Sequence, residues 1–373
     1  MTEITKIALT GGPCAGKTTA VSYIREQLAA HGVQVIAVPE QATALMESGK
    51  TPESMGSYAF HSLLFQNQLE EEEKALQSAK ESTAKKVLIL CDRGLLDSRA
   101  YVSGEEFARY AGEHGLNEAR IRNRYDAVLH MVTAADGAET YYTTDSNGVR
   151  GEDPEQARAL DNRILSLWVG TQHLRVVDNR GDFADKLERL LNEVLGVLGV
   201  PEPLEIELKL LIAYPDINLL QSLPTCRRIP ITQAYLTTPE DGQFRVRKRG
   251  EGADALYIKT VKHKINDMKR IEIEDYITED EYQAYLNRRD CLQGILSKDR
   301  YCLVWHGEYF ELDVYPFWAD RATLELELLS ERQSYELPDF LHLIRDVTFD
   351  KKYRNKQLAS IFKNLFMSEL NNF

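Results

Sequence analysis

The strongest chemical signal in the sequence is a glycine-rich run near the N-terminus. Residues Gly11-Gly-Pro-Cys-Ala-Gly-Lys-Thr18 fit G-x-x-x-x-G-K-[ST] and lie between an apolar run and an amphipathic stretch, the context in which this pattern binds phosphate. Glycines let backbone N–H groups converge on phosphate oxygens, and the following helix N-terminus adds favourable charge. The predicted nucleotide site comprises Gly11, Gly12, Pro13, Cys14, Ala15, Gly16, Lys17, Thr18 and Thr19.

Two side chains of this loop and one acid farther along are candidates for catalysis and metal binding. We expect Lys17 to reach the β- and γ-phosphate oxygens and the Thr18 hydroxyl to bind Mg²⁺. The apolar segment 87–91 ends at Asp92, an acid placed to hold the same metal. The sequence has no N-K-x-D motif to read guanine, so both ATP and GTP remain candidate cofactors.

Four further residues are candidates for contacts with a phosphoryl acceptor or with the transferred phosphoryl group. Arg93 directly follows the metal-binding candidate, and Glu40 follows the second predicted strand, where it either faces an acceptor or only caps a helix. Arg150 and Arg158 follow a polar segment, 143–148, that has the character of a lid. Lid arginines neutralise charge on a phosphoryl group, but an ordinary solvated helix accounts for them equally well.

Charged residues, and one threonine, occupy every second position of several C-terminal segments, which places them on one face of each strand. These positions are Glu205, Glu207, Lys209, Arg245, Arg247, Arg249, Thr260, Lys262, Arg270, Glu272, Glu274, Lys298, Arg300, Glu311, Asp313, Glu325 and Glu327. A solvated sheet face would explain one such strand. Across seven strands, neighbours of one sign repel unless a counter-ion lies between them.

A closed barrel would satisfy this pattern. Acids that point inward would bind a divalent cation, bases that point inward would bind a polyphosphate, and the apolar outer face would be covered by helices. Mg²⁺ or Mn²⁺ suits oxygen ligands, and the near absence of cysteine and histidine in these strands argues against zinc.

The elements that must position these residues differ between the two halves. Apolar runs at 6–10, 33–38, 87–91, 127–132 and 174–177 alternate with amphipathic stretches at 18–30, 58–78, 154–169 and 182–198. This alternation predicts an α/β domain with a parallel sheet and flanking helices. The Pro-rich segment after Leu198 marks a boundary, and period-two alternation beyond it predicts an antiparallel sheet. We therefore expect domains at 1–198 and 205–373, joined by a linker at 199–204.

Bulk composition narrows the class of protein. A length of 373 residues suits two domains, and a formal charge of −13 argues against a general nucleic-acid binder. Five cysteines without a C-x-x-C pair indicate neither a disulfide framework nor a zinc site. We expect a cytoplasmic protein, since no signal sequence and no transmembrane segment is evident.

The first half resembles the NadR-like AAA/kinase family of P-loop domains. The segments that carry the resemblance are GGPCAGKTT, VPEQAT, LCDRGLLDSRAY, RGEDPEQARALDNRI and VVDN, which together span about residues 1–198. The resemblance implies nucleotide binding and raises kinase activity as an option, with an acceptor that the sequence does not identify.

The second half resembles the CYTH, or triphosphate tunnel metalloenzyme, superfamily. Glu205-Ile-Glu-Leu-Lys209 matches its E-x-E-x-K signature, and FRVRKRG, YIKTVK, RIEIE, SKDR, FELDVY and LELEL follow in order. The resemblance implies an eight-stranded antiparallel tunnel that binds and usually hydrolyses a triphosphate. Its implied metal ligands are Glu205, Glu207, Asp313, Glu325 and Glu327. Its implied phosphate contacts are Lys209, Arg245, Arg247, Lys262, Arg270, Lys298 and Arg300.

The combination supports two functions. One is a phosphoanhydride hydrolase that acts on inorganic triphosphate or a nucleotide, with Glu205, Glu207 and Lys209 as catalytic candidates. The other is a nucleotide-dependent regulatory switch, because the domain order also resembles an animal trafficking family that binds GTP and phosphatidic acid. An acidic lipid is therefore a partner implied by resemblance alone. The retained acids favour the enzyme, since a pure anion binder gains nothing from carboxylates beside its ligand.

Overall fold

The protein is described by a computed structural model that covers residues 2–142, 153–200, 206–236, 243–264, 270–288, 294–328 and 333–360. For residues 243, 262–264 and 270–273 it gives the backbone only. The chain divides into two compact units, Met1–Glu202 and Pro203–Phe373. The linker that the Pro-rich segment predicts comprises residues 199–204.

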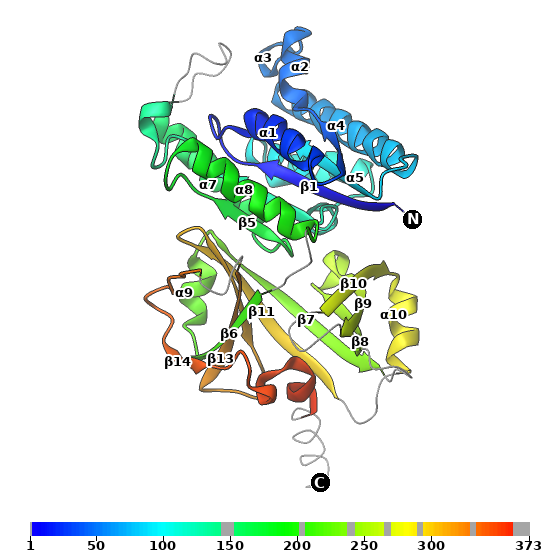
Figure 1. Ribbon diagram of the computed structural model, residues 1–373, viewed down its shortest axis with the longest axis vertical. Coiled ribbons are helices and arrows are strands. Elements are labelled where there is room, and N and C mark those ends of the chain that lie inside the picture. The colour runs from blue at the N-terminus through cyan, green and yellow to red at the C-terminus, as the bar shows by residue number, and fades with distance from the viewer. Residues whose placement is uncertain are drawn as a thin grey trace. The chain divides into compact units, whose positions relative to one another are not determined.

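The first unit contains a five-stranded parallel sheet in the order β2-β3-β1-β4-β5. Figure 1 shows the edge strand β5 beside helix α8. Its strands are β1 (Glu3–Thr10), β2 (Val33–Val38), β3 (Lys86–Asp92), β4 (Ala127–Met131) and β5 (Leu174–Val177). The central strands are buried on both faces, as expected of apolar runs in a parallel sheet. The predicted α/β class is confirmed.

The helices of this unit begin at residues that satisfy their first N–H groups. Asp153 caps α7 with Pro154 at the first helical position, and Asp182 caps α8. The helices are α1 (Lys17–Ala29), α2 (Gln41–Glu47), α3 (Pro52–Met55), α4 (Ser57–Lys80), α5 (Gly104–Glu113), α6 (Glu118–Arg122), α7 (Pro154–Trp168) and α8 (Phe183–Val197), with short 3₁₀ turns η1 (Leu95–Ala100) and η2 (Glu139–Tyr141).

The main core of the first unit lies between the sheet and two of these helices. Ile24 and Leu28 of α1, with Leu190 and Val194 of α8, pack against the apolar side chains of β1, β3 and β4. Helix α4 contacts β2, β3 and α5. Because β1 ends where α1 begins, the loop between them is held at the carboxyl edge of the sheet, where ligands of α/β folds bind.

The second unit contains one antiparallel sheet in the order β10-β9-β8-β7-β11-β12-β13-β6-β14. The strands are β6 (Ile206–Ala213), β7 (Cys226–Leu236), β8 (Gln243–Arg249), β9 (Leu256–Lys264), β10 (Arg270–Ile277), β11 (Ile295–Trp305), β12 (Glu308–Val314), β13 (Arg321–Leu328) and β14 (Leu343–Asp346). Its helices include α9 (Ile217–Ser222) and α10 (Glu279–Leu286), residues 355–360 are also helical, and η3 (Gly252–Asp254) and η4 (Lys351–Tyr353) are 3₁₀ turns.

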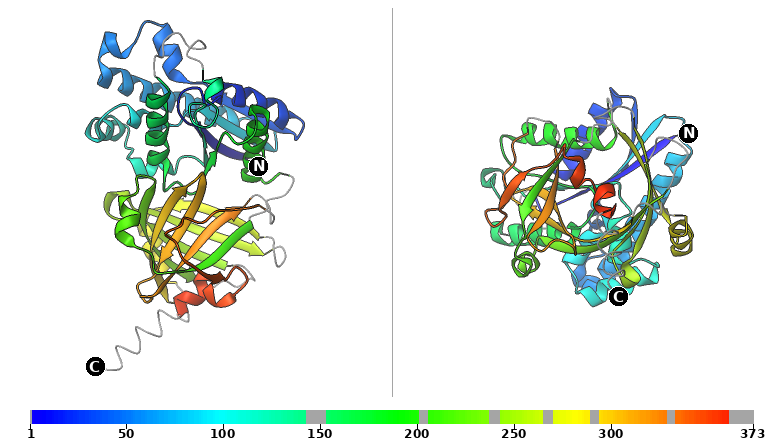
Figure 2. Two further views of the ribbon diagram at one scale, coloured as in Figure 1. Left: turned by 90° about the vertical axis from the view of Figure 1, so that its left-hand side faces the viewer. Right: turned by 90° about the horizontal axis from the view of Figure 1, so that it is seen from below.

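The antiparallel class is confirmed, and the described part of the sheet has nine strands where eight were expected. The additional strand, β14, is four residues long and, among the described residues, pairs with β6 alone. Alternation did not indicate β7, which contains Pro230 and whose last four residues are all buried. The sheet curls strongly (Figure 2, right), and within the described ranges β10 and β14 are its two edge strands.

Side-chain alternation gives this sheet two chemically different faces. Leu210, Leu312 and Leu324 lie on the outer face and form a core with Leu220 of α9 and Leu341. A second core joins Val246 to Tyr282 of α10. The charged residues between these positions therefore share the inner face.

Among the described residues, no helix combines the length and apolarity needed to cross a bilayer.

Candidate functional site

The glycine-rich loop of the first unit is wrapped around its own lysine. Lys17 is buried and its Nζ donates to the carbonyl oxygens of Gly11, at 3.0 Å, and Gly12, at 2.8 Å. Gly11 and Gly16 have φ values of 135° and 86°, and Cys14 has φ 54°. A Cβ on Gly11 would lie 2.1 Å from the Met131 carbonyl oxygen, so only glycine fits there. The loop has the backbone shape that a phosphate cradle needs.

The two predicted metal ligands of this unit are brought together. The Thr18 hydroxyl donates to Asp92 Oδ2 at 3.1 Å. Burial raises the pKa of Asp92, and the nearby Lys17 opposes that rise. Within the described residues, Asp92 Oδ1 is buried without a hydrogen-bond partner. A buried oxygen of this kind fits a hydrated divalent cation, which takes oxygen ligands.

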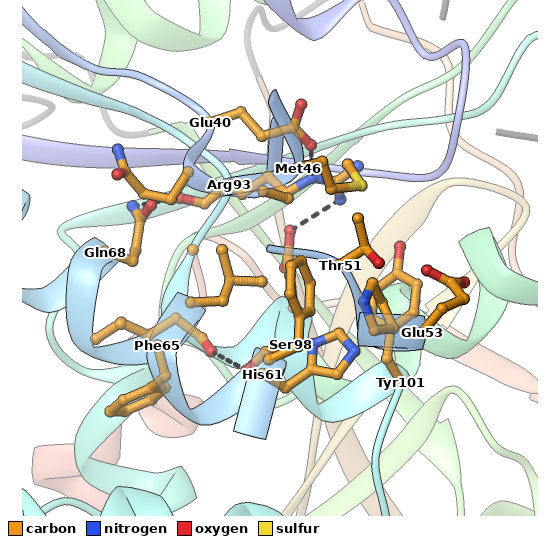
Figure 3. A pocket seen from close by; sticks show the side chains of 18 residues that line it. Glu40, Met46, Thr51, Glu53, His61, Phe65, Gln68, Arg93, Ser98 and Tyr101 are labelled. Carbon is orange, nitrogen blue, oxygen red and sulfur yellow. Dashed lines mark hydrogen bonds and ion pairs between the residues drawn. The ribbon is translucent and has the colours of Figure 1, made fainter. Parts of the chain in front are cut away.

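Arg93 and Glu40 form an ion pair beside the cradle. Arg93 Nε donates to Glu40 Oε1 at 2.7 Å, and its Nη1 donates to the Gly11 carbonyl at 3.2 Å and approaches Asp97 at 3.5 Å (Figure 3). Although burial opposes its charge, neighbouring Tyr101 and Glu40 raise the pKa of Arg93. Glu40 is also the N-cap residue of α2, but its side chain makes no capping bond there, so it is directed toward Arg93 instead.

A pocket of about 250 Å³ adjoins this ion pair. Residues of α2, α3, α4 and η1 line it, together with Glu40 and Arg93 (Figure 3). No local sequence pattern predicts this pocket, because its walls come from segments up to about 60 residues apart in the chain. We call it the side pocket.

Two residues that support the cradle were missed by sequence reasoning. The Asp161 carboxylate of α7 accepts a hydrogen bond from the Gly12 N–H, and its Oδ1 lies 3.2 Å from His130 Nε2. Burial disfavours the charged form of Asp161, but His130 holds the pKa of Asp161 below its ordinary value. Lys186 of α8 donates to the carbonyls of Ala15 and Val132. Burial lowers the pKa of Lys186 to about 8. Asp161 lies within the segment RGEDPEQARALDNRI but was not singled out there, whereas Lys186 lies outside the segments that carry the resemblance. The contacts of both residues with the cradle are visible only in the fold.

Of the two predicted lid arginines, the structure describes Arg158. Arg158 of α7 donates from Nη1 to the Ala135 carbonyl at 2.7 Å, which ties this helix to the loop after β4. Arg150 and the expected lid tip at 143–148 lie outside the described residues.

The inner face of the second unit carries a compact cluster of ion pairs, here called the charge cluster. Its members are Lys209, Lys298, Arg300, Glu311, Asp313 and Glu325. Arg300 contacts all three acids, with Nε at 2.7 Å from Asp313 and Nη2 at 2.7 Å from Glu325. Lys209 Nζ lies 2.7 Å from Glu325, and Lys298 contacts Asp313.

The strand register explains why these residues meet. Arg300 on β11 is opposite Asp313 on β12, Glu311 is opposite Glu325 on β13, and Glu325 is opposite Lys209 on β6. Residues directly opposite one another have Cβ atoms about 5 Å apart. Four adjacent strands thus deliver three cations and three carboxylates to one place.

Burial and charge act in opposite directions within the cluster. Burial alone would neutralise Glu325, but Lys209 and Arg300 hold the pKa of Glu325 well below its ordinary value. Glu325 in turn raises the pKa of Lys209 against the effect of burial. These like charges do not depend on a bound ion for compensation, because acids and bases from neighbouring strands already neutralise each other.

A second basic group lies on β8. Arg245 Nη2 is 3.4 Å from Glu274 Oε1 on β10, and Arg247 Nη1 is 4.0 Å from the same atom. The Thr260 hydroxyl donates to Glu274 at 2.9 Å. Buried Tyr235 of β7 interacts electrostatically with both arginines and with Lys209, and burial raises the pKa of its phenol. Tyr235 is a candidate that sequence reasoning did not include.

The predicted metal ligands of this unit are only partly brought together. Glu207 and Glu327 are opposite one another on β6 and β13, while Asp313 and Glu325 are engaged by the basic residues. Within the described residues, no group of three acids, histidines or cysteines is arranged to hold a metal ion. The Glu207–Glu327 pair is nevertheless an all-oxygen donor set that fits Mg²⁺ or Mn²⁺. Glu205 and the side chains of Lys262, Arg270 and Glu272 lie outside the described residues.

Comparison with known proteins places two families along the chain. A family model described as an AAA domain matches residues 6–186, and one described as a CYTH domain matches residues 203–347. No curated protein matches the chain.

Two solved structures are similar to the chain, those of the hypothetical protein NE1496 and of the inorganic triphosphatase NE1496. Each is 30% identical over 42% of this chain. The match covers 97% of the structure described as the hypothetical protein, with a TM-score of 0.31. It covers 94% of the structure described as the inorganic triphosphatase, with a TM-score of 0.30.

Proposed function

Because the chain belongs to the AAA and CYTH domain families, one after the other, we propose that it is a phosphoanhydride hydrolase. The second unit binds inorganic triphosphate or the triphosphate of a nucleotide and hydrolyses it. The first unit binds ATP or GTP and is able to transfer a phosphoryl group. The observation that carries the proposal is the charge cluster, in which three cations and three carboxylates line one inner sheet face.

The basic residues have the chemistry that a polyphosphate requires. Lys209, Lys298 and Arg300 supply charge-assisted donors to phosphate oxygens, and Arg245 with Arg247 extends the basic surface across β8. The substrate takes over the donors that the carboxylates hold in its absence. Donors fixed in this way stabilise charge on the transferred group without reorganising during the reaction.

The acids have two roles in this proposal. Glu325 and Asp313 hold the lysines and Arg300 in place, so that the donors are positioned before the substrate arrives. Glu207 and Glu327 would hold a divalent cation, which supplies Lewis-acid charge and lowers the pKa of a water molecule. In the first unit, Thr18 and Asp92 would hold Mg²⁺ beside the cradle.

The decisive experiment measures phosphate release from triphosphate, ATP and GTP with Mg²⁺ or Mn²⁺. The wild type is compared with Lys17→Ala and with Glu207→Ala/Glu327→Ala. The matched control is Asp320→Ala, which removes an exposed acid that forms an ion pair with neighbouring Arg321. We expect the double glutamate variant to lose triphosphate hydrolysis and Lys17→Ala to retain it. Loss with Lys17→Ala alone would move hydrolysis to the first unit.

A regulatory switch is the second candidate, favoured by one observation. The acids of the charge cluster are already neutralised by bases, so the sheet could bind an anionic group without turning it over. Tight binding of GTP or of phosphatidic-acid vesicles, with no phosphate release under any metal condition, would replace the hydrolase with this switch.

A further inference from the structure

Helix α7 contacts two segments of the candidate nucleotide site from one face. Its buried residues recur at helical spacing: Ala157, Asp161, Ile164, Leu165 and Trp168. Asp161 on this face reaches the cradle, and Trp168, about two turns farther along, reaches the segment after β3. That segment comprises Arg93, Gly94 and η1, and we call it the Arg93 loop. A single helix thus spans the cradle and the Arg93 loop.

The contact of α7 with the cradle is as close as the chain permits. The Asp161 carboxylate accepts a hydrogen bond from the Gly12 N–H, and a Cβ on Gly12 would lie 2.9 Å from Asp161 Cβ. Any side chain at Gly12 would therefore push the helix away. The carbonyl of Gly12 in turn accepts from Lys17 at 2.8 Å, so α7 is fixed to a residue that holds the cradle lysine.

The contact of α7 with the Arg93 loop is equally close. The Trp168 indole is fully buried and covers Gly94, where a Cβ would lie 2.5 Å from Trp168 Cζ2. Its Nε1 donates to Asp97 Oδ1 at 2.7 Å. A buried indole N–H needs such an acceptor, because an unmet buried donor costs free energy. Trp168 therefore fixes both the backbone of the Arg93 loop and the orientation of the Asp97 carboxylate.

Asp97 joins this helix to Arg93 and to the end of β1. It is 2% exposed, and its Oδ1 also accepts from the hydroxyl of Thr10, the residue directly before the cradle, at 2.7 Å. Its Oδ2 lies 3.5 Å from Arg93 Nη1. A buried carboxylate requires donors of this kind. Because both of its oxygens contact protein donors, Asp97 influences a bound ligand through Arg93.

Arg93 is held in a conformation that depends on these contacts. Its φ of 84° is unusual for a residue with a side chain and is maintained only where the surroundings impose it. Its Nε contacts Glu40, and its Nη1 contacts the Gly11 carbonyl as well as Asp97. Among the described residues, its buried Nη2 has no hydrogen-bond partner. A guanidinium fixed beside the cradle, with one donor group remaining, suits an oxygen of a transferred phosphoryl group.

We propose that Asp97 and Trp168 are positioning residues, through which α7 holds Arg93 in line with a phosphoryl group transferred from the cradle. The proposal rests on the proposed function of the first unit, which is nucleotide binding and phosphoryl transfer. Binding of the nucleotide depends on the cradle backbone and Lys17, whereas Arg93 stabilises the group during transfer. A displacement of about 1 Å in such a group costs about 10²-fold in rate. Loss of either positioning residue therefore impairs transfer and spares binding.

Binding of two Mg²⁺ complexes to the full chain, measured by calorimetry, separates these two stages. A non-hydrolysable analogue of ATP or GTP represents the bound substrate, and ADP or GDP with aluminium fluoride represents the group in transfer. Binding that Lys17→Ala abolishes is assigned to the first unit. We expect Asp97→Asn and Trp168→Phe each to weaken the aluminium fluoride complex by about tenfold or more, and the triphosphate analogue by less than about threefold. Equal weakening of the two complexes, or no weakening of either, overturns the proposal.

A double-variant comparison tests whether the two residues act through Arg93. Arg93→Ala alone should weaken the aluminium fluoride complex, and adding Asp97→Asn or Trp168→Phe should weaken it by less than about twofold more. Additive losses overturn the proposal, because they mean that Asp97 and Trp168 act independently of Arg93. Trp168→Phe keeps a ring over Gly94, so the comparison tests the indole N–H rather than the packing.

Trp305→Phe is the matched control. It makes the same substitution in the second unit, where the Trp305 ring packs edge-on against Phe340, and should leave both affinities unchanged. If Trp168→Phe fails to fold, Asp97→Asn decides alone, because it keeps the shape of the side chain and removes only the charge that faces Arg93.

The outcomes separate this proposal from the proposed function. A wild type that binds neither complex lacks the nucleotide site, which overturns both. A wild type that binds the triphosphate analogue but not the aluminium fluoride complex removes phosphoryl transfer from the proposed function, and the positioning role with it. A wild type that binds both complexes, with variants that weaken them equally, retains the proposed function and overturns the positioning role alone.

Discussion

The two phosphate-handling regions of this chain are built in opposite ways. In the first unit, nine consecutive residues form the cradle, and its lysine is held by two backbone carbonyls of the same loop. In the second unit, six side chains from four strands form the charge cluster, and each cation is held by a carboxylate. A phosphate that enters the cradle competes with neutral acceptors, whereas one that enters the sheet competes with buried ion pairs.

This contrast has an energetic consequence. Removing one partner of a buried ion pair costs much stability, because the remaining partner is left charged in a medium of low dielectric constant. Backbone acceptors impose no such cost, but they require one particular loop conformation. We therefore expect the second unit to be most sensitive to loss of a charge and the first to loss of a glycine.

The largest expected effect is in the charge cluster. Arg300→Met removes the one guanidinium that contacts Glu311, Asp313 and Glu325, and should destabilise the second unit by about 3–5 kcal/mol. Urea unfolding combined with hydrogen exchange of peptides from each unit measures it, and the first unit should be unaffected. Arg321→Met, which breaks an exposed pair on β13, serves as control. Equal stability of Arg300→Met and Arg321→Met would show that the second unit is not especially sensitive to loss of a buried charge.

A smaller effect concerns two buried lysines whose surroundings differ. Burial lowers the pKa of Lys186 to about 8 beside backbone carbonyls, whereas Glu325 raises that of Lys209. Between about pH 8 and the unfolded value of about 10.4, the unfolded state binds more protons at Lys186 than the folded state. The free energy of unfolding of the first unit should therefore rise with pH across this window, by about 1–3 kcal/mol.

Urea unfolding at pH 7, 8.5 and 10 checks this prediction against Lys186→Met, which cannot titrate. The free energy of unfolding of the wild type, minus that of Lys186→Met, should rise with pH. A constant difference would mean that Lys186 has an ordinary pKa in the folded protein.

The smallest expected effect is at the end of the cradle. Gly16 has φ 86°, and a Cβ there would lie 2.6 Å from the ring of Phe183. Gly16→Ala should cost about 1–2 kcal/mol for the left-handed backbone, plus the overlap with the ring, and should weaken nucleotide binding. The double variant Gly16→Ala/Phe183→Ala should regain only the part of the stability that the overlap with the ring costs. Full recovery of stability in the double variant would show that the backbone conformation costs nothing.

Much of the fold was predictable because its signals are local. The five parallel strands and the helices at 154–168 and 183–197 follow from apolar periodicity and from capping residues close in sequence. The cradle was predictable for the same reason, since its function resides in one continuous run. Strand β7 was missed because burial of consecutive residues and Pro230 obscure its alternation.

By itself, the sequence determined which residues carry charge toward one face of each C-terminal strand, because side-chain direction follows the period of two. It did not determine which acid meets which base, since that depends on register between strands far apart in the chain. Only the tertiary structure pairs Arg300 with Asp313 and Glu325, seats Lys186 behind the cradle, and assembles the side pocket beside Arg93. Each of these is a contact between segments whose separation in sequence carries no local signal.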